Sequence, residues 1–177
     1  MRIITGELGG RTIHVPKSFR ARPTTDKARE ALFNILRSRI DLTECKVLDL
    51  FAGTGIISFE FASCGAPMIV AVEKDPIHCK SIRENIKILN VPQVKAVNTD
   101  VFRILKSPSQ TFDIIFADPP FNHRRISEIP GLVMDSGCLT PQGLFILEHG
   151  PELKTDHLRH FRETRHYGKV HFSFFSD

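Results

Sequence analysis

The feature that most constrains the fold is a regular alternation of apolar, β-prone runs with runs of helical periodicity across residues 46–149. The pattern predicts strands at 46–51, 68–73, 94–100, 112–118 and 143–149, with helices between them at 55–65, 78–90, about 101–106 and about 126–136. Apolar strands that alternate with helices form a parallel sheet whose two faces are covered by the helices. We therefore expect an α/β fold.

The segment before this alternation adds a hairpin and a helix. Residues 2–15 contain two short β-prone runs around a glycine-rich turn, a pattern typical of a β-hairpin. Residues 26–39 have apolar positions at helical spacing, with Thr25 or Asp26 as the N-cap.

At the other end, residues 161–167 and 170–175 meet across Gly168 and predict an antiparallel hairpin at one edge of the sheet. The chain has 177 residues and 41% hydrophobic content, which suits one domain with a sizeable core. We expect residues 1–25 to form the N-terminal hairpin extension and residues 26–177 the core.

Positive charge is concentrated near the N-terminus. Residues 1–39 carry nine Lys or Arg and three acidic residues, a net charge of +6 in a chain whose total is +4. A basic segment on a near-neutral body favours a polyanion such as nucleic acid. A solvated basic face on an ordinary enzyme would give the same composition.

Other patterns argue against several kinds of site. The four cysteines lie far apart without a C-x-x-C pair, which indicates neither a zinc site nor a disulfide framework. The eight histidines never form H-E-x-x-H, and His157 and His160 are interpreted as surface residues. No apolar run reaches signal-peptide length or the ~20 residues of a membrane span, so we expect a cytoplasmic protein without a metal.

The strongest local pattern is VLDLFAGTG at residues 47–55, a strand that leads through Asp49 into a turn with Gly53 and Gly55. Glycines at such a strand–turn–helix junction let the backbone approach a nucleotide-like cofactor closely. Glu73 ends the next predicted strand, 18 residues after Gly55, where a carboxylate can accept both ribose hydroxyls of an adenosine.

Two features favour S-adenosylmethionine over NAD at this turn. The third glycine of G-x-G-x-x-G is missing, because Ser58 stands in its place. Asp49 would repel a pyrophosphate, whereas it would attract the cationic amino-acid end of S-adenosylmethionine. Asp100, at the end of the third predicted strand, is placed to accept from an adenine amino group. A tight turn with incidental acidic residues is the alternative.

The fourth predicted strand ends in Asp118, Pro119, Pro120 and Phe121. Proline has no N–H, so this segment presents a carboxylate and carbonyls without a competing donor. An exocyclic amine on a purine is a poor nucleophile because its lone pair is delocalised, and acceptors such as Asp118 and the Pro119 carbonyl can orient it toward a methyl donor. Phe121 offers a ring for a base taken out of its stack. A rigid turn is the alternative interpretation.

This combination resembles the amino-group methyltransferases of nucleic acids. More narrowly, the chain resembles the bacterial 16S ribosomal RNA guanine-N2 methyltransferase family, through RIITGELGGRTI, RPTTDKAREALFNIL, VLDLFAGTG, DPPF and LEHG in that order along nearly its full length. The resemblance implies a seven-stranded, Rossmann-like class I methyltransferase fold with an N-terminal β extension. It also implies S-adenosylmethionine as methyl donor and guanine N2 of 16S rRNA as acceptor.

The resemblance assigns roles to particular residues. The cofactor-binding set is Asp49, Phe51, Gly53, Thr54, Gly55, Glu73, Lys74, Asp100 and Val101. The catalytic set is Asp118, Pro119, Pro120 and Phe121. Positive charge, and not the resemblance, predicts the RNA-binding set, which is Arg2, Arg11, Arg20, Arg22, Arg124 and Arg125, with a solvated loop as the alternative for the last two. Arg22, Pro23 and Thr24 match an R-P-T that is expected to shape the rim of the site.

One segment departs from the family. NHRRISEIPG, after the catalytic motif, is short and basic where relatives often carry a tyrosine within a longer helix-forming stretch. The departure concerns contacts to the target loop. His149, near the predicted carboxyl edge, is interpreted as a packing or loop residue, with a place on the substrate side as the alternative.

Two other functions remain open. DPPF also suits adenine amines, so an adenine-N6 methyltransferase of DNA or RNA is an alternative, although 177 residues leave little room for a separate DNA-reading region. A non-catalytic RNA-binding protein of ribosome assembly is the other, although it would have no chemical need for the glycine turn and the acids. The expected partner is 16S rRNA or the assembling small ribosomal subunit, with no membrane, and the expected state is a monomer.

Overall fold

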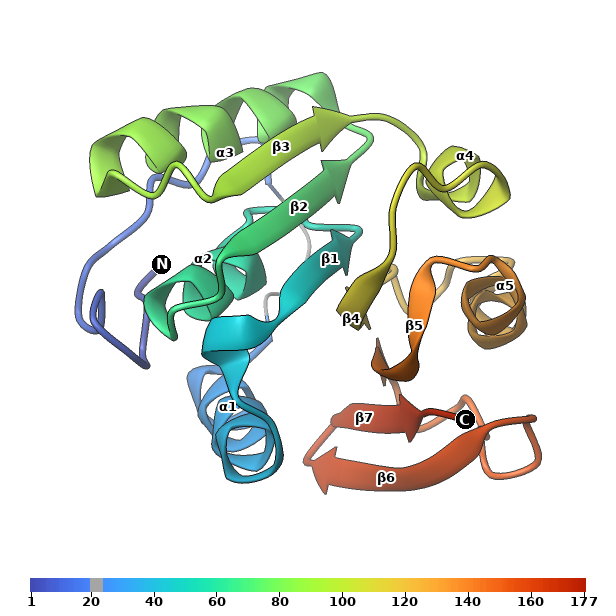
Figure 1. The fold of residues 1–177 in the computed structure, drawn as a ribbon. Coiled ribbons are helices and arrows are strands. Elements are labelled where there is room, and N and C mark those ends of the chain that lie inside the picture. Colours follow the sequence, from blue (N-terminus) through green and yellow to red (C-terminus); the bar gives the residue numbers. More distant parts are fainter. Residues whose placement is uncertain (20–23) are drawn as a thin grey trace.

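The computed structural model describes residues 1–19 and 24–177. It has a seven-stranded sheet of order β3-β2-β1-β4-β5-β7-β6, with helices on both faces (Figure 1). The strands are β1 (Lys46–Leu50), β2 (Met68–Glu73), β3 (Val94–Asn98), β4 (Phe112–Ala117), β5 (Leu139–His149), β6 (Phe161–Tyr167) and β7 (Val170–Phe175). The helices are α1 (Asp26–Arg39), α2 (Ile56–Ser63), α3 (Pro76–Leu89), α4 (Val101–Lys106) and α5 (Ile129–Asp135), with short 3-10 helices η1 (Leu42–Glu44) and η2 (Ile126–Glu128).

Strands β1 to β5 are parallel, and β7 lies antiparallel between β5 and β6. The strand order reverses between β1 and β4, because the chain moves outward to β3 and then returns to the other side of β1 (Figure 1). Open α/β sheets bind their ligands outside the carboxyl ends of the strands at such a point.

The predicted alternation of strands and helices is confirmed. Strand β5 begins at Leu139, earlier than the predicted Gly143. The predicted helix over 126–136 is divided into η2 and α5, and Pro130 stands in the first turn of α5, where a residue without an N–H is favoured. Thr25 is the N-cap of α1, since its side chain accepts from the Ala28 N–H.

The predicted hairpin over residues 2–15 is present but short. Arg2 and Thr12 form an antiparallel bridge, the Ile3 N–H donates to the Arg11 carbonyl at 2.9 Å, and the Ile13 N–H donates to the Met1 carbonyl at 2.8 Å. The pairing ends at a competing acceptor. The N–H groups of Ile4 and Thr5 donate to the Glu60 carboxylate of α2 at 2.8 and 3.0 Å, and not to a facing strand. The two arms therefore pair in the predicted antiparallel direction, but over a shorter segment than predicted.

Two apolar cores cover the two faces of the sheet. In β1, Val47 faces the core formed with α1, α2, α3 and the N-terminal segment, whereas Leu48 faces the core formed with α4 and α5. Because side chains alternate along a strand, Asp49 falls on the α1–α3 face. On β4 and β5, Phe116 and Ile146 belong to the same core as Val47, which fixes the face of the residues that follow them.

A buried ion pair connects the N-terminal segment to the two helices beneath it. Arg29 of α1 is fully buried, and its Nε lies 2.9 Å from Oε1 of Glu60 in α2. The same guanidinium donates to the Arg2 carbonyl at 2.7 Å and to Asp26 at 2.9 Å. Removing one partner of a buried pair typically costs about 3–5 kcal/mol, because the other charge is left uncompensated.

No helix within residues 1–19 and 24–177 combines the length and the hydropathy that a membrane crossing requires.

Candidate active site

The chain leaves β1 through a turn with a left-handed backbone. Phe51, Gly53 and Gly55 have φ values of +60°, +55° and +79°. Such values are strained for a residue with a Cβ, which explains the glycines and makes Phe51 an outlier of the kind that clusters at functional sites. At Gly55 a Cβ would also lie 3.1 Å from both Ile82 and Phe59, so the packing excludes a larger residue.

Glu73, at the end of β2, holds this turn in place. Its carboxylate accepts the Gly53 N–H at 2.8 Å and the Asp75 N–H at 2.7 Å. A carboxylate has about four acceptor positions, so two are left for ligand hydroxyls. The predicted ribose acceptor is therefore tied directly to the predicted cofactor turn.

Asp100 follows β3 and is the N-cap of α4. It accepts the Phe102 N–H at 2.9 Å, and its Oδ2 lies 3.0 Å from Nζ of Lys74. Partial burial acts in the opposite direction, yet this hydrogen bond and the Lys74 charge lower the pKa of Asp100. Val101, also predicted to contact the cofactor, is the buried first residue of α4.

Asp49 is almost completely enclosed, with 1% of its surface exposed. The Ser58 hydroxyl of α2 donates to its Oδ2 at 2.5 Å. Burial raises the pKa of Asp49 to about 7, against the lowering effect of Ser58, and the negative charge of Glu73 adds to the rise. A cation nearby would favour the ionised form, and contact with the amino-acid end of the cofactor stays a prediction.

Thr54, between the two glycines of the turn, is buried, with its Oγ1 3.5 Å from the Met1 sulfur.

The catalytic motif begins one residue after β4 ends. The Asp118 N–H donates to the Leu50 carbonyl at 3.3 Å, which joins the motif to the last residue of β1. Burial raises the pKa of Asp118 well above its usual range, and the carboxylates of Glu148 and Asp49 add to this effect. Asp118 is half-buried and Pro119 is buried, whereas Pro120 is exposed and its carbonyl accepts the His123 N–H at 2.7 Å.

Phe121 lies at the surface with 45% of its area exposed. Its ring borders Gly150, where an added Cβ would lie 3.0 Å from the Phe121 Cδ2 atom. A partly exposed ring beside a glycine is available to a planar ligand.

The sequence did not identify Glu148 as a functional candidate, and it placed Thr24 only at the rim of the site. Glu148 of β5 is 2% exposed, and burial raises its pKa to about 7 against the lowering effects of Thr24 and Arg29. The Thr24 hydroxyl donates to its Oε2 at 2.7 Å. In the sequence Glu148 belongs to LEHG, a motif that carries only the family resemblance. Thr24 was expected at the rim, which this contact fits, whereas Arg22 and Pro23 lie outside the described residues.

Aromatic residues support both loops of the site and gave no clear signal in the sequence. His123 stacks on Phe102 with ring centroids 5.8 Å apart and meets Phe51 edge-on at 5.7 Å. These contacts join the segment after the catalytic motif to the cofactor turn. Phe19 lies over the turn, since a Cβ on Gly53 would be 3.2 Å from its ring.

The predicted RNA-binding arginines have different environments. Arg11 donates to the Ile88 and Leu89 carbonyls at the end of α3, and Arg2 lies 3.8 Å from Asp26. The Arg125 guanidinium lies 4.1 Å from the centre of the Phe102 ring and 2.8 Å from Glu128. Arg124 is exposed and has no ion pair with any described residue. Arg20 and Arg22 lie outside the described residues.

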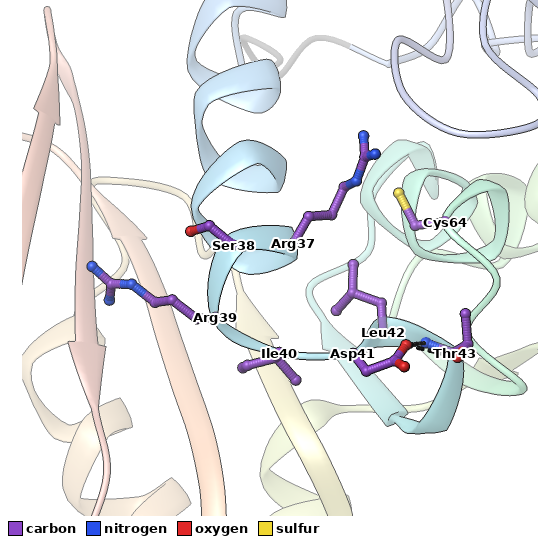
Figure 2. Close-up of a pocket in the computed structure, with 8 residues that line it drawn as sticks. All are labelled: Arg37, Ser38, Arg39, Ile40, Asp41, Leu42, Thr43 and Cys64. Atoms are coloured by element: carbon purple, nitrogen blue, oxygen red, sulfur yellow. Dashed lines mark hydrogen bonds between the residues drawn. The ribbon is translucent and has the colours of Figure 1, made fainter.

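Cavities elsewhere do not coincide with these residues. A shallow pocket of about 480 Å³ adjoins η1 and the end of α1, where Arg37 extends toward Cys64 and Arg39 points away from it (Figure 2). A second cavity, of about 260 Å³, lies between the sheet and the end of α4. Neither is lined by the acids that end the strands.

The acceptor groups at the carboxyl edge of the sheet fit one kind of ligand. Asp49, Glu73, Asp100, Asp118 and Glu148 all belong to or follow strands of this edge. Carboxylates favour hydroxyl groups, amines and cations, and they disfavour the phosphates of a dinucleotide. Among the described residues no cluster of three His, Cys, Asp or Glu could hold a metal ion. Adenosine hydroxyls, an ammonium and a sulfonium meet these requirements.

The strand order, the glycine turn tied to an acid and the DPPF exit define the class of protein, an S-adenosylmethionine-dependent methyltransferase with a class I fold. Within that class, the chain belongs to the family described as Conserved hypothetical protein 95, whose model matches residues 1–176.

Named relatives agree with this assignment. Ribosomal RNA small subunit methyltransferase D of Escherichia coli (strain K12) is 34% identical over 148 residues, which cover 84% of this chain and 74% of that protein. The solved structure of putative methyltransferase yhhF from Escherichia coli is 30% identical, with a TM-score of 0.86 and coverage of 99% of this chain and 96% of that one.

Two further similarities concern the target base. A Thermus thermophilus structure, 16S rRNA N2 G1207 methyltransferase in complex with AdoMet and guanosine, is 26% identical with a TM-score of 0.70, covering 87% of this chain and 44% of that chain. A tRNA1(Val) (adenine(37)-N6)-methyltransferase of Haemophilus influenzae (strain PittEE) is 34% identical over 100 residues, 52% of this chain and 42% of that protein.

Proposed function

We propose that this protein transfers the methyl group of S-adenosylmethionine to the exocyclic N2 amine of a guanine in 16S ribosomal RNA. The observation that carries the proposal is the hydrogen bond from the Asp118 N–H to the carbonyl of Leu50, the last residue of β1 before the cofactor turn. This contact supports a predicted amine acceptor beside the predicted methyl-donor site, in a chain whose relatives are named as small-subunit rRNA methyltransferases.

The cofactor half is proposed to bind by hydrogen bonds from the ligand to fixed acceptors. Glu73 accepts the ribose hydroxyls, and Asp100 accepts the adenine amino group. Ile77, 58% exposed in the first turn of α3 and four residues after Glu73 in the sequence, offers an apolar surface to the adenine ring. Asp49 favours the cationic amino-acid end. When bound, S-adenosylmethionine supplies a methyl group on a positively charged sulfur.

The acceptor half is proposed to orient the amine. The Asp118 carboxylate and the Pro119 carbonyl accept the two N2 hydrogens, which directs the nitrogen lone pair along the line of attack. Phe121 stacks on the base that has left its helix, where base–aromatic contact is worth about 1–3 kcal/mol. The two prolines keep donors away from the amine.

The basic N-terminal segment and Arg124 are proposed to contact phosphates of the RNA. Phosphate contacts make affinity fall with salt, with a slope of about −0.7 per neutralised phosphate on single strands. The assembling small subunit in the cytoplasm is the proposed partner, and a monomer of one domain is the proposed active form.

The direct test is labelled methyl transfer to undermethylated 30S particles and to naked 16S rRNA, followed by nucleoside analysis. The proposal expects N2-methylguanosine on at least one of the two substrates. Absence of transfer to both, together with absence of cofactor binding by calorimetry, would favour a non-catalytic RNA-binding protein.

Adenine N6 is the second candidate acceptor. It is favoured by the similarity to the tRNA adenine-N6 methyltransferase, which covers 52% of this chain. The same nucleoside analysis separates the two, because N6-methyladenosine would replace N2-methylguanosine as product. A supplementary reaction on tRNA covers that substrate class.

A further inference from the structure

A second carboxyl group lies beside the predicted catalytic one. Ala117 of β4 and Leu147 of β5 are register partners on adjacent parallel strands. Asp118 and Glu148 follow these residues directly, so the two side chains leave neighbouring strands at the same level. Both fall on the α1–α3 face of the sheet, because the preceding members of that face are Phe116 and Ile146.

Glu148 is an unusual residue to bury. Only 2% of it is exposed, and among the described residues the neutral Thr24 hydroxyl donates to it at 2.7 Å. Arg29, the buried cation on this face, places its Nε 2.9 Å from Glu60 and its Nη2 2.9 Å from Asp26. Burying an ionised carboxylate is costly without a cation or several donors, so a buried acid in this setting takes up a proton readily.

Two charged groups and one neutral donor face the pair from other parts of the fold. Asp49 of β1 adds negative charge to Asp118. Arg29 of α1 acts on Glu148 as a positive charge. Thr24, just before α1, donates to Glu148. Two like charges on neighbouring strands cannot both ionise cheaply, and protons then leave the pair in two separated steps.

We propose that Glu148 is a positioning residue for the methyl transfer, which shares one proton with Asp118 and thereby makes Asp118 the acceptor of the proton released by the amine. This inference rests on the proposed function. It adds Glu148 and Thr24 to the residues that control the chemical step.

In the proposed step, the carboxyl pair and water take up the proton that the amine releases. Before transfer, the pair carries one proton and one negative charge. As the N–C bond forms and the S–C bond breaks with its electron pair left on sulfur, N2 becomes cationic and passes a proton to the Asp118 carboxylate. Both carboxyl groups are then protonated, and one proton leaves to water before the next turnover.

The test is the pH dependence of single-turnover methyl transfer to 30S particles or 16S rRNA. Activity requires an ionised Asp118, so the rate rises with pH as the pair loses its first proton. In the one-proton state Glu148 is the neutral partner that holds the proton beside the Asp118 anion, and Glu148→Gln removes the group that takes up this proton. We expect the acid limb of its pH–rate profile to move to higher pH by about one unit, a tenfold loss in the ionised fraction of Asp118 on that limb.

Thr24→Val provides a shift of the opposite sign. It removes the donor that stabilises the Glu148 anion, so the shared proton stays on Glu148, Asp118 is left ionised, and the acid limb moves to lower pH. Glu148→Asp, which keeps a carboxyl group, restores an acid limb close to that of the unsubstituted protein. Glu84→Gln, an exposed carboxylate change on α3, is the matched control and leaves the profile in place.

A structural role for Glu148 predicts a different pattern, namely lower thermal stability with an unshifted acid limb. That result, or a shift of Glu148→Gln to lower pH, overturns the inference. If Glu148→Gln does not fold, Thr24→Val decides, because an acid limb that is unchanged or moved upward overturns it equally. Failure of the unsubstituted protein to methylate any RNA would instead contradict the proposed function.

Discussion

The two halves of the carboxyl edge use acidic residues in opposite ways. On the cofactor half, Glu73 and Asp100 accept backbone N–H groups at 2.7–2.9 Å, and Lys74 lies beside Asp100. On the acceptor half, Asp118 and Glu148 lie on neighbouring strands, and burial raises the pKa of both. The first arrangement fixes the predicted ligand-binding groups in place, whereas the second is the pair of acids proposed to exchange a proton.

Asp49 lies at the boundary between the halves. It is on β1 with the cofactor turn, yet burial raises its pKa to about 7 and its charge acts on Asp118. A cationic ligand beside Asp49 would reduce this repulsion. Cofactor binding and ionisation of Asp118 are therefore expected to support one another.

The largest effect is expected at Asp118. Asp118→Ala removes the amine acceptor and should lower the rate of methyl transfer about 100-fold or more, while cofactor affinity measured by calorimetry stays nearly the same. Asp118→Asn keeps one acceptor oxygen but cannot take a proton, so it separates orientation from proton transfer. A rate for Asp118→Ala equal to that of the unsubstituted protein would remove the assigned role.

The next effect is expected at Glu73. Glu73→Ala leaves the Gly53 and Asp75 N–H groups without their acceptor and removes the ribose contact, so cofactor affinity should fall about tenfold to 100-fold. Isothermal calorimetry with S-adenosylmethionine measures it, with Glu84→Gln as an exposed control. An affinity within twofold of the control would show that Glu73 is not the ribose acceptor.

A smaller effect is expected at Phe121. Phe121→Ala removes the exposed ring, so KM for the RNA should rise about tenfold, the equivalent of about 1.4 kcal/mol of stacking. Phe121→Trp retains an aromatic surface and should preserve KM in the same steady-state assay. Equal KM values for the Ala and Trp variants would contradict stacking of the base on this ring.

The smallest effect is expected at Arg124. Arg124→Gln should weaken RNA binding only about threefold and reduce the salt slope by somewhat less than one. Arg125→Gln is the matched comparison, because that guanidinium already contacts Phe102 and Glu128. Filter-binding across a salt series distinguishes them. A larger slope change for Arg125 than for Arg124 would reverse the assignment.

Strand identity and the acids that end the strands could be predicted because both depend on local pattern. Apolar runs identified β1 to β5, and an acid directly after or within the end of such a run marked Asp49, Glu73, Asp100 and Asp118. The parallel arrangement then placed these groups at one edge of the sheet.

Contacts across the fold could not be predicted in the same way. Thr24 and Glu148 are 124 positions apart, and their contact depends on how α1 packs against the sheet. The N-terminal hairpin is shorter than predicted for a related reason, since Glu60 of α2 takes the N–H groups of Ile4 and Thr5. Charge counting similarly could not show that Arg11 is engaged by α3.

The most direct test of the division into two halves is single-turnover methyl transfer with saturating S-adenosylmethionine, comparing Glu73→Ala with Asp118→Ala. The account predicts that the Glu73→Ala rate approaches that of the unsubstituted protein at saturation, because only cofactor binding was weakened. The Asp118→Ala rate should stay about 100-fold low at every cofactor concentration. Recovery of Asp118→Ala at saturation, with a persistent loss in Glu73→Ala, would contradict the account.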